Sequence, residues 1–425
     1  MARWFYTLIL HLLLPLVWLR VLWRGRSAPG YAERTGERFG KVRGLPVGGI
    51  VIHAVSFGET QAAQPLVNAL RAAHPELPLL ITNTTATGAE RVRSLWSGKI
   101  AQCWLPYDYP WAVEAFLDAC RPRLFIVMET ELWPNLLAAL KRRGIPVLLA
   151  NARLSERSAQ GYGRFAWLTR PMLASLTRLA AQDADTARRF EGLGMPAADI
   201  RITGSLKFDL TLPEDLSERV AAIRRDWNLA ERQVWVASST HDGEDEIVLD
   251  AHRALRADFP DLLLLLVPRH PERFYKVSAL VRQRNFNLVR RSDGQAVSAG
   301  TEVFLGDSMG EMLLWCALAD VAFVGGSFVK VGGHNPLEAA ALCVPVVTGP
   351  EMFNFQQIAD RLAEAGALVQ ADSPDALVRQ LSHWLGDYIA RQRAGGAGMA
   401  VVDANRGALS RHMALVDELL RDPAA

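Results

Sequence analysis

The chain has 425 residues, a length typical of two or three domains at about 150 residues each. Half of the residues are hydrophobic, 22% are charged and the mean hydropathy is +0.07, which excludes a disordered chain, a collagen and a polytopic membrane protein. Lys and Arg number 47 against 45 Asp and Glu, so no overall basic excess indicates a nucleic-acid partner, and any anion-binding surface must be local.

The N-terminal segment departs from this composition. No Asp, Glu, Lys or Arg lies between Trp4 and Leu19, and apart from Arg20 the apolar stretch continues to Trp23. This is near the lower limit for a spanning helix, roughly 17–25 residues. One Arg precedes the stretch, whereas seven Lys and Arg residues follow it by residue 43.

These charges predict a membrane anchor over residues 1–25, with the rest of the chain on the cytoplasmic side. The basic residues would also attract an anionic lipid surface. A helix that lies in the membrane interface stays open as an alternative, because His11 and Pro15 weaken a spanning helix.

After residue 45, short apolar runs alternate with amphipathic stretches. The runs are continuous rather than alternating, as in strands buried on both faces of a parallel sheet with crossover helices. We expect strands within residues 48–56, 77–83, 101–106, 124–130, 146–152, 178–182, 199–205, 233–239, 261–269, 286–292, 301–308, 320–327 and 344–350.

This pattern predicts two doubly wound α/β domains that face a cleft, with ligands beyond the carboxyl ends of the strands. We expect an N-terminal domain over residues 30–208, a linker within 209–219 and a C-terminal domain over 218–425. Whether the last helices return to the N-terminal domain stays open. The glycines at 395–398 are expected to break the C-terminal helices.

Three carboxylates follow strands of the first half. Glu59, in HAVSFGET, lies in the first turn of a predicted helix, where an ionised carboxylate could take a proton from a hydroxyl. Glu129 and Glu131, in VMETELWPN, are close enough for one to raise the proton affinity of the other. Ordinary roles in the first helical turn or as helix caps remain the alternatives.

Cations follow other strands. Lys207, in GSLKFD, ends the last strand of the first half and could face an anionic substrate, although a solvated surface Lys is the simpler alternative. Arg269, in VPRHPERF, follows the most apolar strand, and an Arg can fork onto phosphate or carboxylate oxygens. Met309, Gly310 and Glu311 form a strand-to-helix turn of the kind that binds anions.

The segment FVGGSFVKVGGHNPLEAA is the most specific. A buried strand enters a glycine-rich loop with Lys330 and His334, and a helix then opens at Asn335 and Pro336 with Glu338 in its first turn. Glycines allow a ligand close to the backbone, and a helix N-terminus takes a phosphate. The combination predicts a nucleotide-sugar site.

No metal site is expected. Asp183 and Asp185, in QDADT, match the DxD pattern of some glycosyltransferases, but they open a helix and capping explains them. Neither the His residues nor the four scattered Cys residues have metal-ligand spacing, and no GxSxG or Walker motif is present.

The motifs HAVSFGE, METELWPN, NARLSERS, GSLKFD, ASSTHDGEDE, VPRHPERF, GDSMGEM and GGSFVKVGGHNPLEAA occur in this order. Together they resemble the 3-deoxy-D-manno-octulosonic acid (Kdo) transferases of lipopolysaccharide synthesis, over nearly the whole chain. One departure is HAVSFGE, where that family more often has small residues before the Gly-Glu pair; the Glu itself is kept.

The resemblance implies a GT-B glycosyltransferase fold, attachment to the bacterial inner membrane, and metal-independent, inverting transfer of Kdo from CMP-Kdo to a lipid A precursor. It implies that Glu59 is the general base and that Glu129 and Lys207 stabilise the transition state. The positions that match the family's CMP-binding residues are Pro268, Arg269, Met309, Gly310, Glu311, Asn335, Pro336, Leu337 and Glu338.

Two alternatives stay open. One is another GT-B or epimerase-type enzyme that uses a UDP-sugar, which predicts stronger stabilisation by UDP than by CMP. The other is a membrane-tethered sugar-nucleotide binding protein without catalysis. The number of Kdo residues added, the acceptor-site residues and the oligomeric state do not follow from the sequence.

Overall fold

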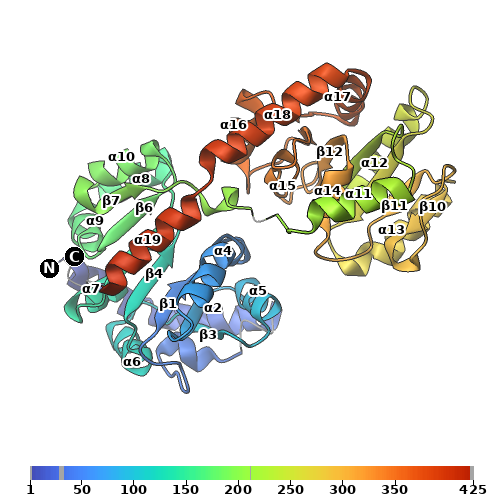
Figure 1. The fold of residues 1–425 in the computed structure, drawn as a ribbon. Helices are drawn as coiled ribbons and strands as arrows, with labels where there is room; N and C mark the ends of the chain where they lie inside the picture. Colours follow the sequence, from blue (N-terminus) through green and yellow to red (C-terminus); the bar gives the residue numbers. More distant parts are fainter. Residues whose placement is uncertain (1, 28–32, 211, 422–425) are drawn as a thin grey trace. The chain divides into compact units, whose positions relative to one another are not determined.

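A computed structural model describes residues 2–27, 33–210 and 212–421 (Figure 1). The chain divides into two compact units: unit 1 comprises residues 1–209 and 406–425, and unit 2 comprises residues 210–405. The expected domain limits at residues 30 and 425 lie outside the described residues, as does Met1 of the expected anchor.

Unit 1 is built on a seven-stranded parallel sheet with the strand order β3-β2-β1-β4-β5-β6-β7. Ile50 of β1 pairs with Leu79 of β2 on one side and Leu124 of β4 on the other. Residues of β1, β2, β4 and β5 are buried throughout, as the continuous apolar runs predict. The strands are β1 (Ile50–His53), β2 (Leu79–Asn83), β3 (Ala101–Trp104), β4 (Leu124–Met128), β5 (Val147–Ala152), β6 (Arg178–Ala181) and β7 (Ile200–Ile202).

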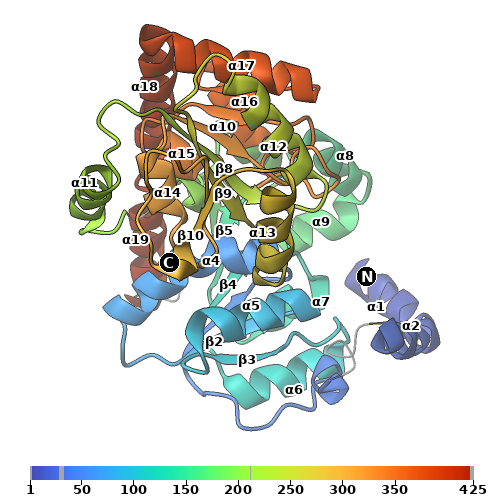
Figure 2. The same ribbon diagram turned by 90° about the vertical axis from the view of Figure 1, so that its right-hand side faces the viewer.

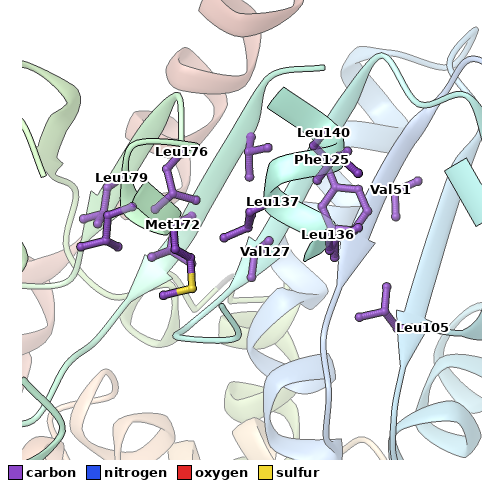
Figure 3. Packing of buried hydrophobic residues seen from close by; sticks show 14 of the residues in the cluster. Val51, Leu105, Phe125, Val127, Leu136, Leu137, Leu140, Met172, Leu176 and Leu179 are labelled. Carbon is purple, nitrogen blue, oxygen red and sulfur yellow. The ribbon is translucent and has the colours of Figure 1, made fainter. Parts of the chain in front are cut away.

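Helices cover both faces of this sheet. On one face, residues of α6, α7, α9 and α10 share an apolar cluster with strand residues such as Val51, Phe125 and Val127. Figure 3 shows Leu136, Leu137 and Leu140 of α7 in this cluster. On the other, α4, α5 and α19 cover Ile50 and Ile52. The helices and short 3-10 turns of unit 1 in this part are η1 (Thr35–Phe39), α4 (Phe57–Ala73), α5 (Ala86–Trp96), α6 (Pro110–Cys120), α7 (Pro134–Arg142), α8 (Glu156–Arg164), α9 (Ala166–Leu173), α10 (Ala184–Gly192), η2 (Ala197–Asp199), η3 (Leu206–Phe208) and α19 (Ala408–Arg421).

The C-terminal helix α19 belongs to unit 1, where it contacts α4 and β5 (Figure 1). Its attachment is polar as well as apolar: the Asp209 carboxylate accepts the backbone N–H groups of Gly407 and Leu409, and His412 Nε2 accepts the N–H of Asn151 at 2.9 Å. The last segment of the chain therefore completes the core of the first unit.

The N-terminal segment forms two helices, α1 (Ala2–Leu12) and α2 (Leu14–Ser27) (Figure 2). Among the described residues no single helix is both long and apolar enough to cross a membrane; Arg3–Leu12 and Leu14–Val21 meet that test only as a pair, bent by 53° at the break. Pro15 accounts for the break, because it has no N–H to donate to the preceding turn and disfavours a helical residue before it.

Unit 2 repeats the architecture with a seven-stranded parallel sheet in the order β10-β11-β9-β8-β12-β13-β14. Every strand expected from the sequence is present, and the edge strand β14 is an addition. The strands are β8 (Val234–Thr240), β9 (Leu263–Pro268), β10 (Leu288–Arg290), β11 (Val303–Leu305), β12 (Val321–Val324), β13 (Val346–Thr348) and β14 (Leu368–Gln370).

The helices of unit 2 pack on both sides of its sheet, with α12, α13 and α17 on the face of Trp235 and Ala237 (Figure 2). They and the short 3-10 turns are α11 (Leu216–Asp226), α12 (Glu244–Leu255), η4 (Pro271–Arg273), α13 (Phe274–Gln283), η5 (Arg291–Asp293), α14 (Met312–Leu318), α15 (Leu337–Ala340), α16 (Gln356–Glu364), α17 (Pro374–Gly386) and α18 (Tyr388–Asn405).

The expected helix break at residues 395–398 is wrong, because α18 runs through it. A Cβ on Gly395 would lie 1.9 Å from the carbonyl oxygen of Cys343, and one on Gly398 would lie 3.3 Å from the Cβ of Ala340. These glycines therefore serve close packing of a continuous helix rather than a turn.

Candidate functional site

In each sheet the chain reverses its direction of travel between two central strands, β1 and β4 in unit 1 and β8 and β12 in unit 2. Crevices at such switch points, at the carboxyl ends of the strands, are where open α/β sheets bind ligands. The residues selected from the sequence follow these strands and their neighbours in both units.

Glu59 follows β1 and takes part in the N-terminal cap of α4, whose N-cap residue is Ser56. Its Oε2 accepts the N–H of Val55 at 2.8 Å and its Oε1 accepts the Ser56 hydroxyl at 3.0 Å, while Ser56 Oγ accepts the N–H of Glu59. Burial raises the pKa of Glu59 to about 7; the hydrogen bonds from Val55 and Ser56 oppose the rise, and the charges of Glu129 and Glu131 add to it. The capping alternative is thus correct in geometry, and the same carboxyl group also titrates near neutrality.

Glu129 follows β4, the strand beside β1. It is buried and holds a φ of 58°, a left-handed conformation that costs a non-glycine residue about 1–3 kcal/mol. Its Oε2 accepts Arg153 Nε at 2.8 Å, which fixes the carboxylate. Glu131 lies next to it, and burial followed by the Glu129 charge raises the pKa of Glu131. The structure therefore brings the three predicted carboxylates of unit 1 into one electrostatic cluster.

Lys207 belongs to the same cluster. It lies in η3, just after β7, and is largely buried rather than solvated. Burial lowers the pKa of Lys207, the Glu129 charge opposes this and the Arg153 charge adds to it. The edge of unit 1 thus combines three carboxylates with two cations, a set able to accept a proton and to balance a developing charge.

The edge of unit 2 is organised by Glu244, which the sequence analysis did not single out. This side chain is fully buried at the start of α12, and its two oxygens accept four backbone N–H groups. The donors are His241 at 2.9 Å, Gly326 at 2.6 Å, Ser327 at 3.0 Å and Phe328 at 2.9 Å.

Glu244 changes the interpretation of the glycine-rich loop. The N–H groups of residues 326–328 are occupied by a carboxylate of the protein, so these three N–H groups are not available to a ligand. The helix after Asn335 and Pro336, α15, spans only four residues and supplies little dipole. Two kinds of candidate remain for an anion at this edge: the side chains there and the backbone of the turn at Met309 and Gly310.

Arg269 and Glu338 are the leading pair of such side chains. Within the described ranges, no hydrogen bond or ion pair engages the half-buried Arg269 guanidinium, whereas Arg273 nearby is held by Thr240 O and the Asp245 carboxylate. Burial raises the pKa of Glu338 to about 7, opposed by a hydrogen bond from Asn335 and by the Arg269 charge. Pro268 ends β9 and so directs Arg269, and Leu337 is buried beside Glu338.

Met309 and Gly310 lie in the turn between β11 and α14, and Gly310 has a φ of 83°. Glu311 closes this turn: its carboxylate accepts Arg291 Nε at 3.0 Å, Arg219 at 3.1 Å and the Ser308 hydroxyl at 2.6 Å. Because its carboxylate is saturated, Glu311 can offer a ligand its backbone rather than its side chain.

Three histidines gather beside Arg269, of which the sequence analysis noted only His334. His241 follows β8, His270 follows β9 and His334 follows β12, three adjacent strands. His241 Nε2 and His334 Nε2 are 2.8 Å apart, and the ring of His270 meets that of His241 edge to face with centroids 5.2 Å apart. No spacing rule predicts this cluster, because it depends on the strand order.

The DxD pattern is a helix cap. Asp183 Oδ1 accepts the N–H of Thr186 at 2.7 Å at the start of α10, and Asp185 pairs with Arg188. Within the described residues no group of three or more His, Cys, Asp or Glu side chains is arranged to hold a metal ion.

The comparisons with known proteins agree with this geometry. Residues 33–210 match the family model of the 3-deoxy-D-manno-octulosonic-acid transferase N-terminal region, and residues 231–400 match that of glycosyl transferases group 1. The chain is 43% identical to 3-deoxy-D-manno-octulosonic acid transferase from Haemophilus influenzae, with 99% of each chain covered. It is 40% identical to the transferase of the same name from Bordetella pertussis, over 99% of this chain and all of that one.

Solved structures support the fold. UDP-GlcNAc 2-epimerase from Neisseria meningitidis, bound to UDP-GlcNAc, shares 13% identity over 88% of this chain and 100% of its own, with a TM-score of 0.55. Two parallel-sheet α/β units of this kind are the GT-B architecture expected from the sequence. From the whole-length identity and the two family models, the chain belongs to the 3-deoxy-D-manno-octulosonic acid (Kdo) transferase family and is a glycosyltransferase.

Proposed function

We propose that this enzyme transfers Kdo from CMP-Kdo to a hydroxyl of a lipid A precursor, with inversion at the anomeric carbon and release of CMP. The single observation that carries the proposal is the difference between the side chains at the strand ends of the two units. A carboxylate with a pKa of about 7 lies at the switch point of unit 1, and a half-buried guanidinium without a partner among the described residues lies beside that of unit 2.

The chemical step needs one proton acceptor. The acceptor oxygen forms a bond to the anomeric carbon of Kdo, the bond from that carbon to the phosphate oxygen breaks, and the bonding pair leaves with CMP. Glu59 takes the proton of the attacking hydroxyl. A pKa close to the working pH suits a general base, because enough of the carboxylate is ionised and it still binds the proton well.

Glu129 and Lys207 are assigned to charge stabilisation rather than proton transfer. Arg153 fixes the Glu129 carboxylate, and the Glu129 charge opposes the lowering of the Lys207 pKa by burial. Such a preorganised pair stabilises charge that develops in the transition state without reorganising. The left-handed backbone of Glu129 is consistent with a position held under strain for function.

The donor is assigned to unit 2. Arg269 pairs with the phosphate, Glu338 and Asn335 accept hydrogen bonds from the ribose, and the backbone at Met309, Gly310 and Glu311 lines the nucleotide. Pro268, Pro336 and Leu337 shape these segments. Support comes from the Arg269 guanidinium, which has no partner in the part of the chain that the structure describes, and from Glu338, whose burial next to Arg269 indicates that a polar ligand completes its surroundings. No metal is expected to take part, and that remains a prediction.

A lipid acceptor lies in a membrane, so the enzyme needs a surface that can contact lipid. Unit 1 has such a surface. The exposed apolar side chains of α1 and α2 include Trp4, Leu12, Leu16 and Trp23, which are 60–71% exposed. Phe165, Trp167 and Trp111 of the folded domain are also exposed, and Phe5 meets Trp167 with ring centroids 6.3 Å apart. An apolar surface of this kind is typical of interaction with lipid or with another protein.

The two N-terminal helices are fastened to the domain. Tyr109 donates its hydroxyl to Leu10 O at 3.0 Å, Thr7 Oγ1 donates to Asn135 Oδ1 at 3.1 Å, and Trp18 stacks on Phe39 with centroids 4.7 Å apart. We therefore propose that α1 and α2 lie in the membrane interface on the cytoplasmic face of the bacterial inner membrane, as part of unit 1. The basic residues Arg20, Lys41 and Arg43 are exposed and would favour anionic lipid.

The test is a product assay. Purified full-length enzyme is incubated with CMP-Kdo and a lipid A precursor, and the product is weighed by mass spectrometry. A mass gain of one or more Kdo residues, with equivalent CMP released, supports the proposal. Stabilisation by UDP above CMP with no Kdo transfer would instead favour a UDP-sugar enzyme, and binding of CMP-Kdo without turnover would favour a binding protein.

A further inference from the structure

The histidine pair of unit 2 has a geometry that a packing role does not require. The Nε2 atoms of His241 and His334 are 2.8 Å apart, the ring planes differ by 7° and the ring centroids are 5.0 Å apart. Two coplanar rings at this distance meet edge to edge through their Nε2 atoms rather than face to face. This is an N–H···N hydrogen bond, which requires a hydrogen on one Nε2 and a lone pair on the other.

This bond fixes what the pair can offer to a ligand. With the Nε2 atoms joined, only the Nδ1 atoms remain, and in the described part of the chain neither forms a hydrogen bond. The ring that accepts at Nε2 must carry its own hydrogen on Nδ1 when neutral. The pair therefore presents at least one N–H donor outward, and two if it takes up a proton.

The pair is held in place by the framework of the donor site. The backbone N–H of His241 is bonded to the buried Glu244, and so are those of the loop that leads to His334. A Cβ on Gly326 would lie 3.0 Å from the ring of His334, so the loop glycine leaves room for that ring. Both imidazoles are positioned before any ligand arrives.

Arg269 is the charge shared by the side chains at this edge. It acts on Glu338 and also on His334 and His241, and all four side chains follow neighbouring strands of one sheet. The carboxyl group assigned to the ribose and the histidine pair therefore both lie within electrostatic reach of Arg269. A nucleotide sugar likewise carries a ribose and a sugar on one phosphate.

An activated octulosonic acid differs from an activated hexose in one respect that matters here. It is a 2-keto acid sugar, so its anomeric carbon bears both the phosphate oxygen and a carboxylate. Such a donor brings two neighbouring anions into the site, and the edge of unit 2 has two anion receptors, the Arg269 guanidinium and the histidine pair.

We propose that His241 and His334 form the carboxylate-binding subsite of the donor: their Nδ1–H groups bind the sugar carboxylate while Arg269 binds the phosphate. This inference rests on the proposed function and deepens it by naming the residues that distinguish a keto-acid sugar from a neutral hexose. Burial and the neighbouring Arg269, His241 and His270 charges lower the pKa of His334 to about 3, so the empty pair is neutral and has one Nδ1–H. The second Nδ1–H forms when a bound carboxylate favours the uptake of a proton by the pair.

Two variants separate the two nitrogens of His334. In His334→Gln the amide reaches the position of Nε2, so the bond to His241 is kept and the Nδ1 donor is lost. In His334→Asn the amide nitrogen takes the position of Nδ1, so the outward donor is kept and the inward bond is lost. The exposed His383 on α17 provides the matched control, His383→Gln.

The experiment compares the Kd for CMP, measured by calorimetry, with kcat/KM for CMP-Kdo, all on the full-length protein. For His334→Gln we expect kcat/KM to fall about 10- to 100-fold, the value of one charged hydrogen bond, while the Kd for CMP changes less than about threefold. His334→Asn should lose less than His334→Gln, and His383→Gln should resemble the parent.

Three results would overturn the inference: a parallel loss of CMP affinity, which would assign the pair to the phosphate; an equal loss in His334→Asn and His334→Gln, which would assign it to the structure; and no loss in either variant. The parent enzyme separates this failure from that of the proposed function. If the parent does not transfer Kdo at all, the proposed function fails; if the parent is active and His334→Gln is also active, only the carboxylate subsite fails.

Discussion

The two units of this enzyme place a glutamate at equivalent positions and use it in different ways. Glu59 follows β1 and Glu244 follows β8, the central first strand of each sheet, and each lies in the first turn of the next helix. The carboxylate of Glu59 bonds to residues of its own helix cap. That of Glu244 is fully buried and joins two segments more than eighty residues apart in sequence.

This difference shows how one architecture can supply two functions. Burial, with a smaller contribution from two other acidic groups, raises the pKa of Glu59 to about 7 although it accepts two hydrogen bonds, so its protonation can change during a reaction. Glu244 accepts hydrogen bonds from four backbone N–H groups and so holds the loop of the donor site in place. Carboxylates surround Glu59 at the strand ends of unit 1, whereas Arg269 and the histidines lie at the strand ends of unit 2.

Glu59→Gln should have the largest effect on activity. The amide keeps the shape and an acceptor oxygen for the N–H of Val55, so the fold should be retained, but it cannot take a proton. Loss of a general base lowers the rate by about 10²–10⁴. The measurement is kcat at saturating CMP-Kdo, with the exposed Glu90→Gln as the control; near-normal turnover would remove Glu59 from the mechanism.

The pH profile gives a second readout of the same group. Because burial raises the pKa of Glu59 to about 7, the base is mostly protonated below that pH, and kcat should rise as the pH increases through about 7. The same shift has a defined sign for stability: a raised carboxyl pKa stabilises the fold fully below the unfolded value of 4.5, and this contribution is lost as the pH rises towards 7. A parent profile that is flat between pH 5.5 and about 8 would contradict the assignment.

Glu244→Ala should lower the stability of unit 2 and leave the proposed base, Glu59 in unit 1, unchanged. Four backbone N–H groups would lose their acceptor, and at about 1–3 kcal/mol for each unsatisfied group, a loss of about 3 kcal/mol is expected even after water compensates in part. For a unit of this size that corresponds to a Tm lower by about 6–12 °C.

Asp242→Ala is the matched control for Glu244→Ala. Asp242 is the neighbouring exposed acid and pairs with Lys276 at the surface, where solvent screening leaves an ion pair with little effect on stability. Differential scanning calorimetry with and without CMP makes the comparison. If both variants have the same Tm, Glu244 does not hold the loop of the donor site in place.

Arg269→Ala should weaken CMP binding about 10- to 100-fold, because a charged hydrogen bond contributes about 1.5–3 kcal/mol. Arg269→Lys should recover only part of this loss, since an ammonium cannot fork onto two oxygens. Calorimetric titration with CMP is the measurement. The exposed Arg282→Lys on α13 is the control, and unchanged affinity in Arg269→Ala would place the phosphate elsewhere.

The sequence predicts local features well and long-range ones poorly. Continuous apolar runs identify thirteen strands, because a strand buried on both faces consists of consecutive apolar residues. The edge strand β14 spans only three residues, too few to form a recognisable run. Glu59 and Arg269 could be selected because each follows a strand directly. Glu244 could not, because its partners lie in a loop that is distant in sequence, and His241 meets His334 across 93 residues.

The glycines show the same limit of a local pattern. Gly395 and Gly398 are typical of a break in a helix, but here they let α18 approach Cys343 and Ala340, residues that the local sequence does not reveal. The glycines at 325 and 326 suggest a ligand close to the backbone, but the N–H groups of Gly326 and Ser327 are bonded to Glu244. In both places the glycine indicates that another atom lies close to the backbone, but the sequence does not show which atom it is.

The smallest expected effect concerns the surface of unit 1. Leu12 and Leu16 are exposed on α1 and α2, so the double variant Leu12→Ser, Leu16→Ser should fold normally. If these side chains enter lipid, their loss should weaken binding to anionic vesicles about tenfold or more, because each buried leucine contributes about 1.5–3 kcal/mol.

Activity on acceptor embedded in vesicles should fall with vesicle binding, while activity on detergent-dispersed acceptor should be nearly unchanged, since only the effective concentration at the membrane is lost. Ile389→Ser, at an exposed apolar position of unit 2, is the control. Substitution is preferable to removal of residues 1–25, because Tyr109 and Phe39 contact this segment and would be uncovered. Equal losses on both acceptors would show that the segment completes the acceptor site, and no loss on vesicles would show that other parts of the protein bind the membrane.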